Sequence, residues 1–221
     1  MEERSQEPRH ANDTSEIKNL HVPECAADGT VPVWGVSVSG EVVFRSGVTQ
    51  LKPVGNKWNL ISVECPMRTI CASVDSRGVW AVSKDGRAHL RLGVSKKNPQ
   101  GMQWVNIDAP NHPLVNVATG AGTVWGLDQS CALYRRKNVQ QLFPEGTEWV
   151  FVSGNIKNIS VSSNGDLWAV LETFEYEQGT SAQGVIAKRQ DINDENFVGT
   201  GWDYTIGTGW SYVSARVPLP L

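Results

Sequence analysis

Tryptophan recurs at a fixed interval along this chain of 221 residues, and this interval restricts the possible folds more than any other feature. Four of the nine tryptophans stand 46, 45 and 43 residues apart, at Trp34, Trp80, Trp125 and Trp168. A second series follows the first three of these after 24 residues, at Trp58, Trp104 and Trp149. Two series in step indicate one supersecondary unit repeated along the chain.

The first tryptophan series lies in a short apolar motif, written as Val-Trp-Gly-Val, Val-Trp-Ala-Val, Val-Trp-Gly-Leu and Leu-Trp-Ala-Val. Gly40 and Gly86 stand six residues after their tryptophans, in hairpin signals, and Cys131 takes that place in the third copy. One period holds four predicted strands, one opening at Trp58 and others at 70–74, 79–82 and 88–92. Four short strands in ~45 residues are typical of a propeller blade, and no segment has a long helical apolar period. The sequence therefore predicts an all-β fold, a β-propeller of four-stranded antiparallel blades with about four repeats.

The fourth copy is longer than the others. The interval from Trp168 to Trp202 does not match that between the two series, whereas residues 207–215 align without gaps on residues 146–154. That alignment assigns Trp210 to the place of Trp149. We therefore expect an insertion at about 173–184 and a second, looser segment near 191–202.

Both ends of the periodic part fall in mid-blade, at the Trp34 strand and after Trp210. The terminal strands would then either pair to close a ring or belong to a larger propeller, and Pro218 and Pro220 favour a fragment. We expect residues 1–20 to form a disordered polar leader and residues 21–221 the propeller, with units near 31–62, 63–107, 108–153 and 154–215.

Composition excludes several classes of function. A net charge of −3 gives no basic surplus for a phosphate backbone, so we expect no nucleic-acid partner. Apolar runs are too short for a transmembrane segment or a secretory signal, which predicts a cytoplasmic protein. The four cysteines are unevenly spaced and expected to be reduced, and the four histidines show no metal-ligand spacing. No enzymatic motif is present, so we predict a protein without catalytic activity, metal or cofactor.

One polar feature recurs with the blades. A basic residue stands eleven places after the first three tryptophans of the first series, and Lys188 is assigned the equivalent place after the insertion. Rotational symmetry would set these four at one height, as a candidate ring for an anionic ligand or an acidic partner segment. The alternative is that outer strands carry basic residues to protect their edges. The candidate ring consists of Arg45, Arg91, Arg136 and Lys188.

The tryptophans themselves have two interpretations, as core residues or as flat faces for sugar rings. Fixed positions inside apolar strands favour a structural role for the repeated ones. Trp202 and Trp210 are the candidate exposed recognition aromatics. The insertion, which is acidic through Glu172, Glu175 and Glu177, is the candidate individual recognition loop.

A Val-Trp-Gly-Val strand, a turn, a strand ending in Arg and a second Trp followed by Val or Ile resemble the tectonin repeat, from about Val31 to Ser214. The resemblance implies a non-enzymatic interaction scaffold with protein partners, like the intracellular tectonin β-propeller repeat-containing proteins of autophagy and vesicle trafficking. Such a protein would be cytoplasmic or peripheral on vesicle or autophagosomal membranes. The alternative within the group is a lectin that binds glycans or bacterial lipopolysaccharide, and anionic lipid is a further candidate ligand.

Overall fold

The computed structural model describes residues 16–22, 31–72, 78–176, 179–193, 195–204 and 207–215. The regular structure in these ranges is entirely β, in four sheets of four strands each. All strand pairs are antiparallel, and the strands of each sheet follow one another in chain order. This is the propeller architecture that the tryptophan period predicts.

Each sheet is one blade, numbered here from the N-terminus. The strands of blades 1 and 2 are β1 (Ile17–His21), β2 (Val33–Ser37), β3 (Val42–Arg45), β4 (Trp58–Ile61), β5 (Met67–Ala72), β6 (Val79–Ser83), β7 (Ala88–Leu92) and β8 (Gln103–Ile107). Those of blades 3 and 4 are β9 (Leu114–Gly120), β10 (Thr123–Asp128), β11 (Leu133–Arg136), β12 (Trp149–Ser153), β13 (Ile156–Val161), β14 (Leu167–Glu175), β15 (Ser181–Arg189) and β16 (Trp202–Asp203).

The first tryptophan series lies on the second strand of every blade. Trp34, Trp80 and Trp125 are almost completely buried, and Trp168 is half-buried. Strands β2 and β6 are buried along their whole length. Continuous apolar motifs are typical of strands buried on both faces, which is why the repeated motif does not alternate with polar residues.

Three apolar cores lie between successive blades. Trp34 belongs to the core between blades 1 and 2, Trp80 to the next and Trp125 to the third. A tryptophan at the start of the fourth strand of the following blade, in its first or second position, packs against each core. These are Trp104, Trp149 and Trp202 respectively. Trp202 therefore belongs to the second series, and the prediction that it lies outside the phase was wrong.

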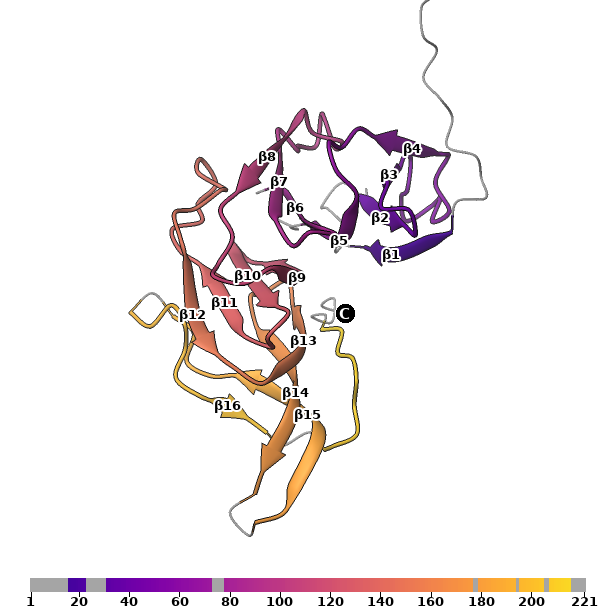
Figure 1. Cartoon of the computed structure of the whole chain (residues 1–221). Helices are drawn as coiled ribbons and strands as arrows, with labels where there is room; N and C mark the ends of the chain where they lie inside the picture. The colour runs from indigo at the N-terminus through magenta and orange to yellow at the C-terminus, as the bar shows by residue number, and fades with distance from the viewer. Residues whose placement is uncertain are drawn as a thin grey trace, which may run out of the picture.

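The four blades follow one another around an arc, with the inner strands β1, β5, β9 and β13 toward its centre (Figure 1). The ring is not closed between blade 1 and blade 4 (Figure 1). Each blade is nevertheless complete, because β1 pairs with β2 and supplies the inner strand that the sequence analysis missed. The prediction that the periodic part begins in mid-blade was therefore wrong, and Ile17–Leu20, assigned to the polar leader, are part of β1. Residues 1–15 and 216–221 lie outside the described residues.

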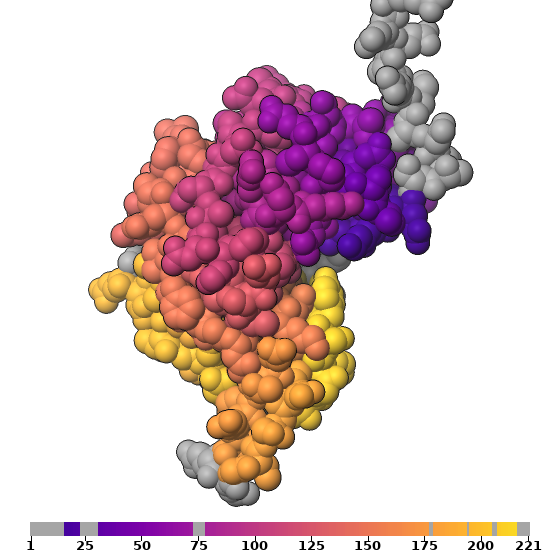
Figure 2. Space-filling view, viewed as in Figure 1, coloured from indigo at the N-terminus to yellow at the C-terminus, as the bar shows by residue number. Residues whose placement is uncertain are grey.

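Blade 4 differs from the others by a long hairpin. Strands β14 and β15 have nine residues each and project beyond the rest of the arc (Figures 1 and 2). The extra length lies between Trp168 and Gly184, as predicted for the insertion, although Glu177 lies outside the described residues.

The expected second insertion near 191–202 is absent. Trp202 follows Arg189 at the same interval at which Trp58 follows Arg45, so the loop of blade 4 has the length of the loop in blade 1. No helix able to span a membrane occurs in the part of the chain that the structure describes.

Candidate functional site

In every blade, an arginine near the end of the third strand stacks on a tryptophan at the start of the fourth strand. The arginine is the last residue of the third strand, or next to it. Its register partner is the tryptophan that is the first or second residue of the fourth strand. The guanidinium carbon lies 5.1 to 5.5 Å from the ring centre in the four pairs Arg45–Trp58, Arg91–Trp104, Arg136–Trp149 and Arg189–Trp202. Such stacking is worth about 0.5–2 kcal/mol, more where the pair is desolvated.

Each of these arginines also holds the loop that leads to its tryptophan. The Nε–H donates to the backbone carbonyl nine residues ahead, at 2.8 to 3.0 Å, in Val54, Gln100, Glu145 and Val198. A glycine with positive φ follows each acceptor. A Cβ there would lie 2.4 to 2.7 Å from the carbonyl oxygen of the residue after the arginine, and 3.0 to 3.2 Å from the arginine Cγ. The repeated unit is thus an arginine, a glycine and a tryptophan that together fix one loop.

These contacts correct one member of the predicted ring. The residue equivalent to Arg136 in blade 4 is Arg189, whereas Lys188 occupies the place of Arg135, opposite the first-series tryptophan. The ten extra residues of the β14–β15 hairpin hide this one-residue offset in the sequence. Lys188 forms an ion pair with Asp166 at 3.0 Å, and Arg135, whose pKa is lowered by burial to about 10, stacks on Trp125.

The three arginines of the predicted ring differ in exposure. Arg136 is buried and forms an ion pair with Asp108 at 2.6 Å, while Arg45 and Arg91 are half-buried. Burial lowers the pKa of Arg91 below its ordinary value. Of these three arginines, Arg45 and Arg91 are therefore the more accessible to an anionic ligand, and the binding role of the ring stays a prediction.

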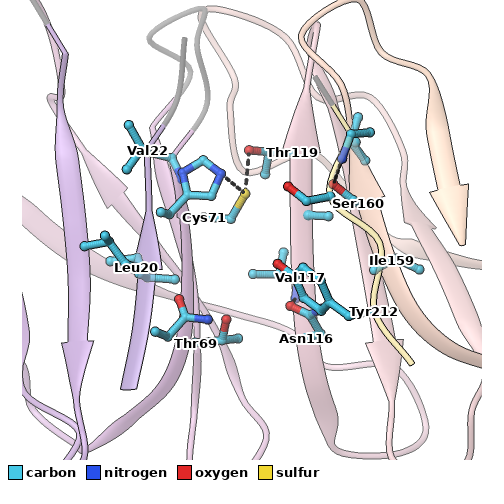
Figure 3. Close-up of a pocket in the computed structure, with 18 of the residues that line it drawn as sticks. Leu20, Val22, Thr69, Cys71, Asn116, Val117, Thr119, Ile159, Ser160 and Tyr212 are labelled. Carbon is cyan, nitrogen blue, oxygen red and sulfur yellow. Dashed lines mark hydrogen bonds between the residues drawn. The ribbon is translucent and has the colours of Figure 1, made fainter. Parts of the chain in front are cut away.

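The second candidate site is a cavity of about 170 Å³ at the centre of the arc (Figure 3). All four inner strands line it, together with Tyr212, Ser214 and Ala215 of the C-terminal segment. Its polar lining residues include Asn19, His21, Thr69, Cys71, Asn116, Thr119 and Ser160. Ligand pockets for drug-sized molecules have volumes of about 300–1,000 Å³, so this cavity is too small for one.

Cys71 and His21 form a polar junction in this cavity. The sulfur lies 3.4 Å from His21 Nε2 and 3.3 Å from Thr119 Oγ1, joining blades 1, 2 and 3 (Figure 3). His21 Nδ1 accepts a hydrogen bond from the Ala72 amide, so a neutral ring carries its proton on Nε2, facing the sulfur. Burial raises the pKa of the Cys71 thiol, but the electrostatic interaction with His21 and the hydrogen bonds of His21 and Thr119 outweigh it and lower the pKa.

No sequence pattern predicted that Cys71 and His21 lie together. The strand register could have indicated this, because both residues lie on inner strands, each directly opposite the first-series tryptophan of its blade. The described residues contain no cluster of three or more histidine, cysteine or acidic side chains able to hold a metal ion. Cys65, Cys71 and Cys131 are free thiols in the structure.

Of the two candidate recognition aromatics, Trp202 is half-buried under Arg189 and belongs to the core between blades 3 and 4. Trp210 is 53% exposed. It does not take the place of Trp149, because Trp202 does.

An aromatic cluster lies next to the long hairpin. Phe174 contacts Tyr176 and Tyr204, with ring centres 4.9 and 4.4 Å apart, and both tyrosines are exposed. Tyr204 follows the fourth strand of the blade and is distant in sequence from the other two rings, which hid the cluster from motif analysis.

Comparisons with known proteins agree with the repeat. A family model described as "Tectonin domain" matches residues 110–216, and one described as "Propeller" matches residues 32–61 and 78–107. The solved structure of human WBSCR16 resembles the chain with a TM-score of 0.53 at 9% identity, over 82% of this chain and 49% of that one. YCF48 from Cyanidioschyzon merolae resembles it with a TM-score of 0.51 at 14% identity, over 88% and 57%. These two likenesses concern the fold alone.

Curated relatives carry the same repeat. The Tectonin beta-propeller repeat-containing protein of Drosophila melanogaster is 38% identical over 84% of this chain, and Tectonin beta-propeller repeat-containing protein 1 of Mus musculus is 34% identical over 88%. The chain spans only 14% and 17% of the length of these two relatives. The repeat architecture, the family models and these identities agree, and this chain belongs to the tectonin β-propeller repeat-containing family.

Proposed function

We propose that this chain is a non-enzymatic interaction scaffold that binds protein partners in autophagy or in vesicle and membrane trafficking. The tectonin family and the propeller fold support the scaffold role, and the resemblance to the intracellular tectonin proteins supports the cellular process. The cellular site would be the cytoplasm, including the surface of vesicles or autophagosomes.

The long hairpin of blade 4 is the observation that carries this proposal. Three blades have short turns between their second and third strands, whereas β14 and β15 extend ten residues further and project into solvent (Figure 2). Glu172 and Glu175 are exposed on it, and Phe174 and Tyr176 form an aromatic surface beside them. A repeat determines the scaffold, and recognition belongs to the segment that departs from it.

The chemistry of the hairpin indicates its partner. Its charges are negative and its aromatic rings are partly exposed, so the complementary surface is a basic protein segment that carries an apolar side chain. Charge complementarity would accelerate the encounter, and the aromatic rings would contribute most of the buried contact area.

A ten-residue deletion offers a sharp test. Removal of residues 174–183 places Gly184 six residues after Trp168, which is the spacing of Gly40 and Gly86 from their tryptophans. The shortened chain should therefore fold with the same blades, which its melting temperature would check. Binding of both chains to a purified ubiquitin-like autophagy modifier and proximity labelling in starved cells are the readouts.

We expect the parent chain to label autophagy or trafficking proteins and the shortened chain to lose them. Equal labelling by both chains would contradict the role of the hairpin. Glycan-array binding without labelling of such proteins would support the lectin alternative and contradict the trafficking role.

The proposed anion ring is tested separately with vesicles that contain phosphoinositides. Arg45→Gln and Arg91→Gln together should weaken binding, whereas Arg45→Lys and Arg91→Lys keep the charge and should retain it. Equal binding by both double variants would contradict an anion-binding role for the ring.

A further inference from the structure

The segment Trp210–Ala215 repeats the inner strand of a blade, residue by residue. The inner strands β5, β9 and β13 begin with Met-Arg-Thr-Ile-Cys-Ala, Leu-Val-Asn-Val-Ala-Thr and Ile-Lys-Asn-Ile-Ser-Val, and residues 210–215 are Trp-Ser-Tyr-Val-Ser-Ala. A large apolar residue comes first, an aliphatic residue fourth and a small residue fifth in all four.

One backbone hydrogen bond fixes this alignment. The amide of the first inner-strand residue donates to a carbonyl in the preceding blade, from Met67 to Gly40, Leu114 to Gly86 and Ile156 to Cys131, at 2.8 to 2.9 Å. The Trp210 amide donates to the Gly184 carbonyl at 2.9 Å. Gly40, Gly86, Cys131 and Gly184 all have positive φ and occupy one position relative to the third strand of their blade.

A second contact occurs at the centre of the arc. The amide of Ala72, sixth in its inner strand, donates to the side chain of His21 in the preceding blade. The amide of Ala215, sixth in its segment, donates to Ser160 Oγ at 2.9 Å, and Ser160 takes the place of His21 opposite its tryptophan. Tyr212, Ser214 and Ala215 also line the central cavity beside the four inner strands.

The first residue of this segment is far more exposed than the first residues of the inner strands. Met67, Leu114 and Ile156 are at most 1% exposed, whereas Trp210 in the same place is 53% exposed. A large aromatic side chain held by its backbone in a core position, with its face in solvent, lacks the blade that covers the others.

We propose that Trp210–Ala215 is the inner strand of a fifth blade, and that its free edge and the Trp210 face accept the remaining three strands of a tectonin blade. The first of these strands carries the Val-Trp-Gly-Val or Val-Trp-Ala-Val pattern and pairs antiparallel with the segment, its tryptophan opposite Ser214. A second copy of this chain fits less well, because each of its four blades already contains an inner strand.

The full chain can be given these strands directly. Cys71 and Trp80 are nine residues apart, and a copy of residues 79–107 appended after Leu221 places its tryptophan nine residues after Ser214. The matched control carries Trp80→Asp in the appended copy alone, because a charged side chain at this buried strand position prevents the copy from packing as a blade. Hydrogen exchange of residues 210–215, measured by mass spectrometry, is the readout.

We expect exchange of residues 210–215 to slow at least tenfold in the first fusion and to stay at the level of the parent chain in the control. Trp210→Ser should lower the melting temperature of the fusion and leave that of the parent chain unchanged. Equal exchange in the two fusions would overturn the proposal. A parent dimer that Trp210→Ser dissociates, seen by sedimentation, would assign the surface to a second copy instead.

A pair of glycine substitutions tests the segment without any appended strands. A Cβ on Gly184 would lie 2.1 Å from the Trp210 carbonyl oxygen, whereas one on Gly179, which also has positive φ, would meet nothing within 4 Å. Gly184→Ala should accelerate exchange of residues 210–215, and Gly179→Ala should not. Unchanged exchange in both variants would show that the segment is not held as an inner strand, and would overturn the proposal even if the fusions failed to fold.

Discussion

Arg136 shows at the residue scale why the basic residues of this repeat serve the fold. Its side chain is 3% exposed and contacts the ring of Trp149, the carbonyl of Glu145 and the carboxylate of Asp108. The neighbouring Lys137 pairs with Glu148 at 3.0 Å, but both side chains are largely exposed. Of these two adjacent cations, Arg136 is thus part of the buried packing, whereas Lys137 forms a surface ion pair.

We predict that Arg136→Met lowers the free energy of unfolding by roughly 2–4 kcal/mol, since it removes hydrogen bonds to a buried charged group and a stacked pair. Lys137→Gln should cost less than about 1 kcal/mol, because exposed ion pairs contribute little. Urea denaturation of both variants measures the difference. Similar losses in the two would contradict a structural role for the arginine–tryptophan unit.

His89 gives the chain a pH dependence. It is 5% exposed on β7, and Cys65 Sγ lies 3.7 Å from its Nε2. Burial lowers the pKa of His89; nearby Asp85 and Glu64 act in the opposite direction, and Arg87 adds to the lowering. The unfolded chain therefore binds a proton near the ordinary histidine pKa of about 6.5, whereas the folded chain does so only at lower pH.

We therefore predict that the free energy of unfolding falls as pH drops below about 6.5, by at most ~1.4 kcal/mol per pH unit from this residue. His89→Asn should flatten the dependence between the ordinary pKa and the lower folded-state pKa. Denaturation curves from pH 7.5 to 5 test this, with His112→Asn at an exposed histidine as control. A dependence unchanged by His89→Asn would assign it to other groups.

At the element scale, the blades join through the residue with positive φ before each third strand. Gly86 has φ 88°, and a Cβ there would lie 2.3 Å from the Cβ of Pro113 in the next blade. Cys131 occupies the same position in blade 3 with φ 64°, which is unfavourable for a residue with a side chain.

Opposite effects are therefore expected at equivalent positions. Gly86→Ala should destabilise the chain by about 1–3 kcal/mol through strain and the clash with Pro113. Cys131→Gly should be neutral or stabilise it by up to ~1 kcal/mol, since glycine relieves the strain at some cost in unfolded-state entropy. Gly154→Ala, with open space around the Cβ, is the control. Thermal unfolding would contradict this view if Gly86→Ala were as mild as Gly154→Ala.

The elements that the sequence predicted are those repeated at constant spacing. The first-series tryptophans, the hairpin turns and the third and fourth strands of blades 1 to 3 recur within one or two residues, so position alone identified them. Strand β1 was missed because its sequence is polar and because His21 lies further from Trp34 along the chain than Cys71 does from Trp80. In blade 4, the longer hairpin moved Arg189 and Trp202 out of the repeat spacing. Lys188, the basic residue beside Arg189, was therefore aligned with Arg136 by mistake.

The candidate site was less predictable than the fold. The junction of Cys71, His21 and Thr119 joins three blades. Cys71 and His21 lie opposite the tryptophans of their blades, whereas Thr119 lies one residue further along its inner strand, and no sequence motif links the three. The contact of Phe174 with Tyr204 depends on the packing of the residue after β16 against the long hairpin. Both are products of tertiary packing, which spacing along the chain does not record.

At the scale of the whole molecule, the blades form a one-dimensional stack bent into an arc. Interior blades contact a neighbour on each side, whereas blades 1 and 4 each have one neighbour in the described arc (Figure 1). In such stacks the stability of a unit depends on its interfaces with its neighbours. A closed ring would give all blades two neighbours and similar protection.

Hydrogen exchange of the full chain, measured by mass spectrometry under native conditions, tests the open arc most directly. We predict slowest exchange in β6 and β9 of the interior blades, faster exchange in β1 and β13, and fastest exchange in residues 210–215. Equal protection of all four inner strands, with residues 210–215 as protected as β9, would show a closed ring and contradict the account.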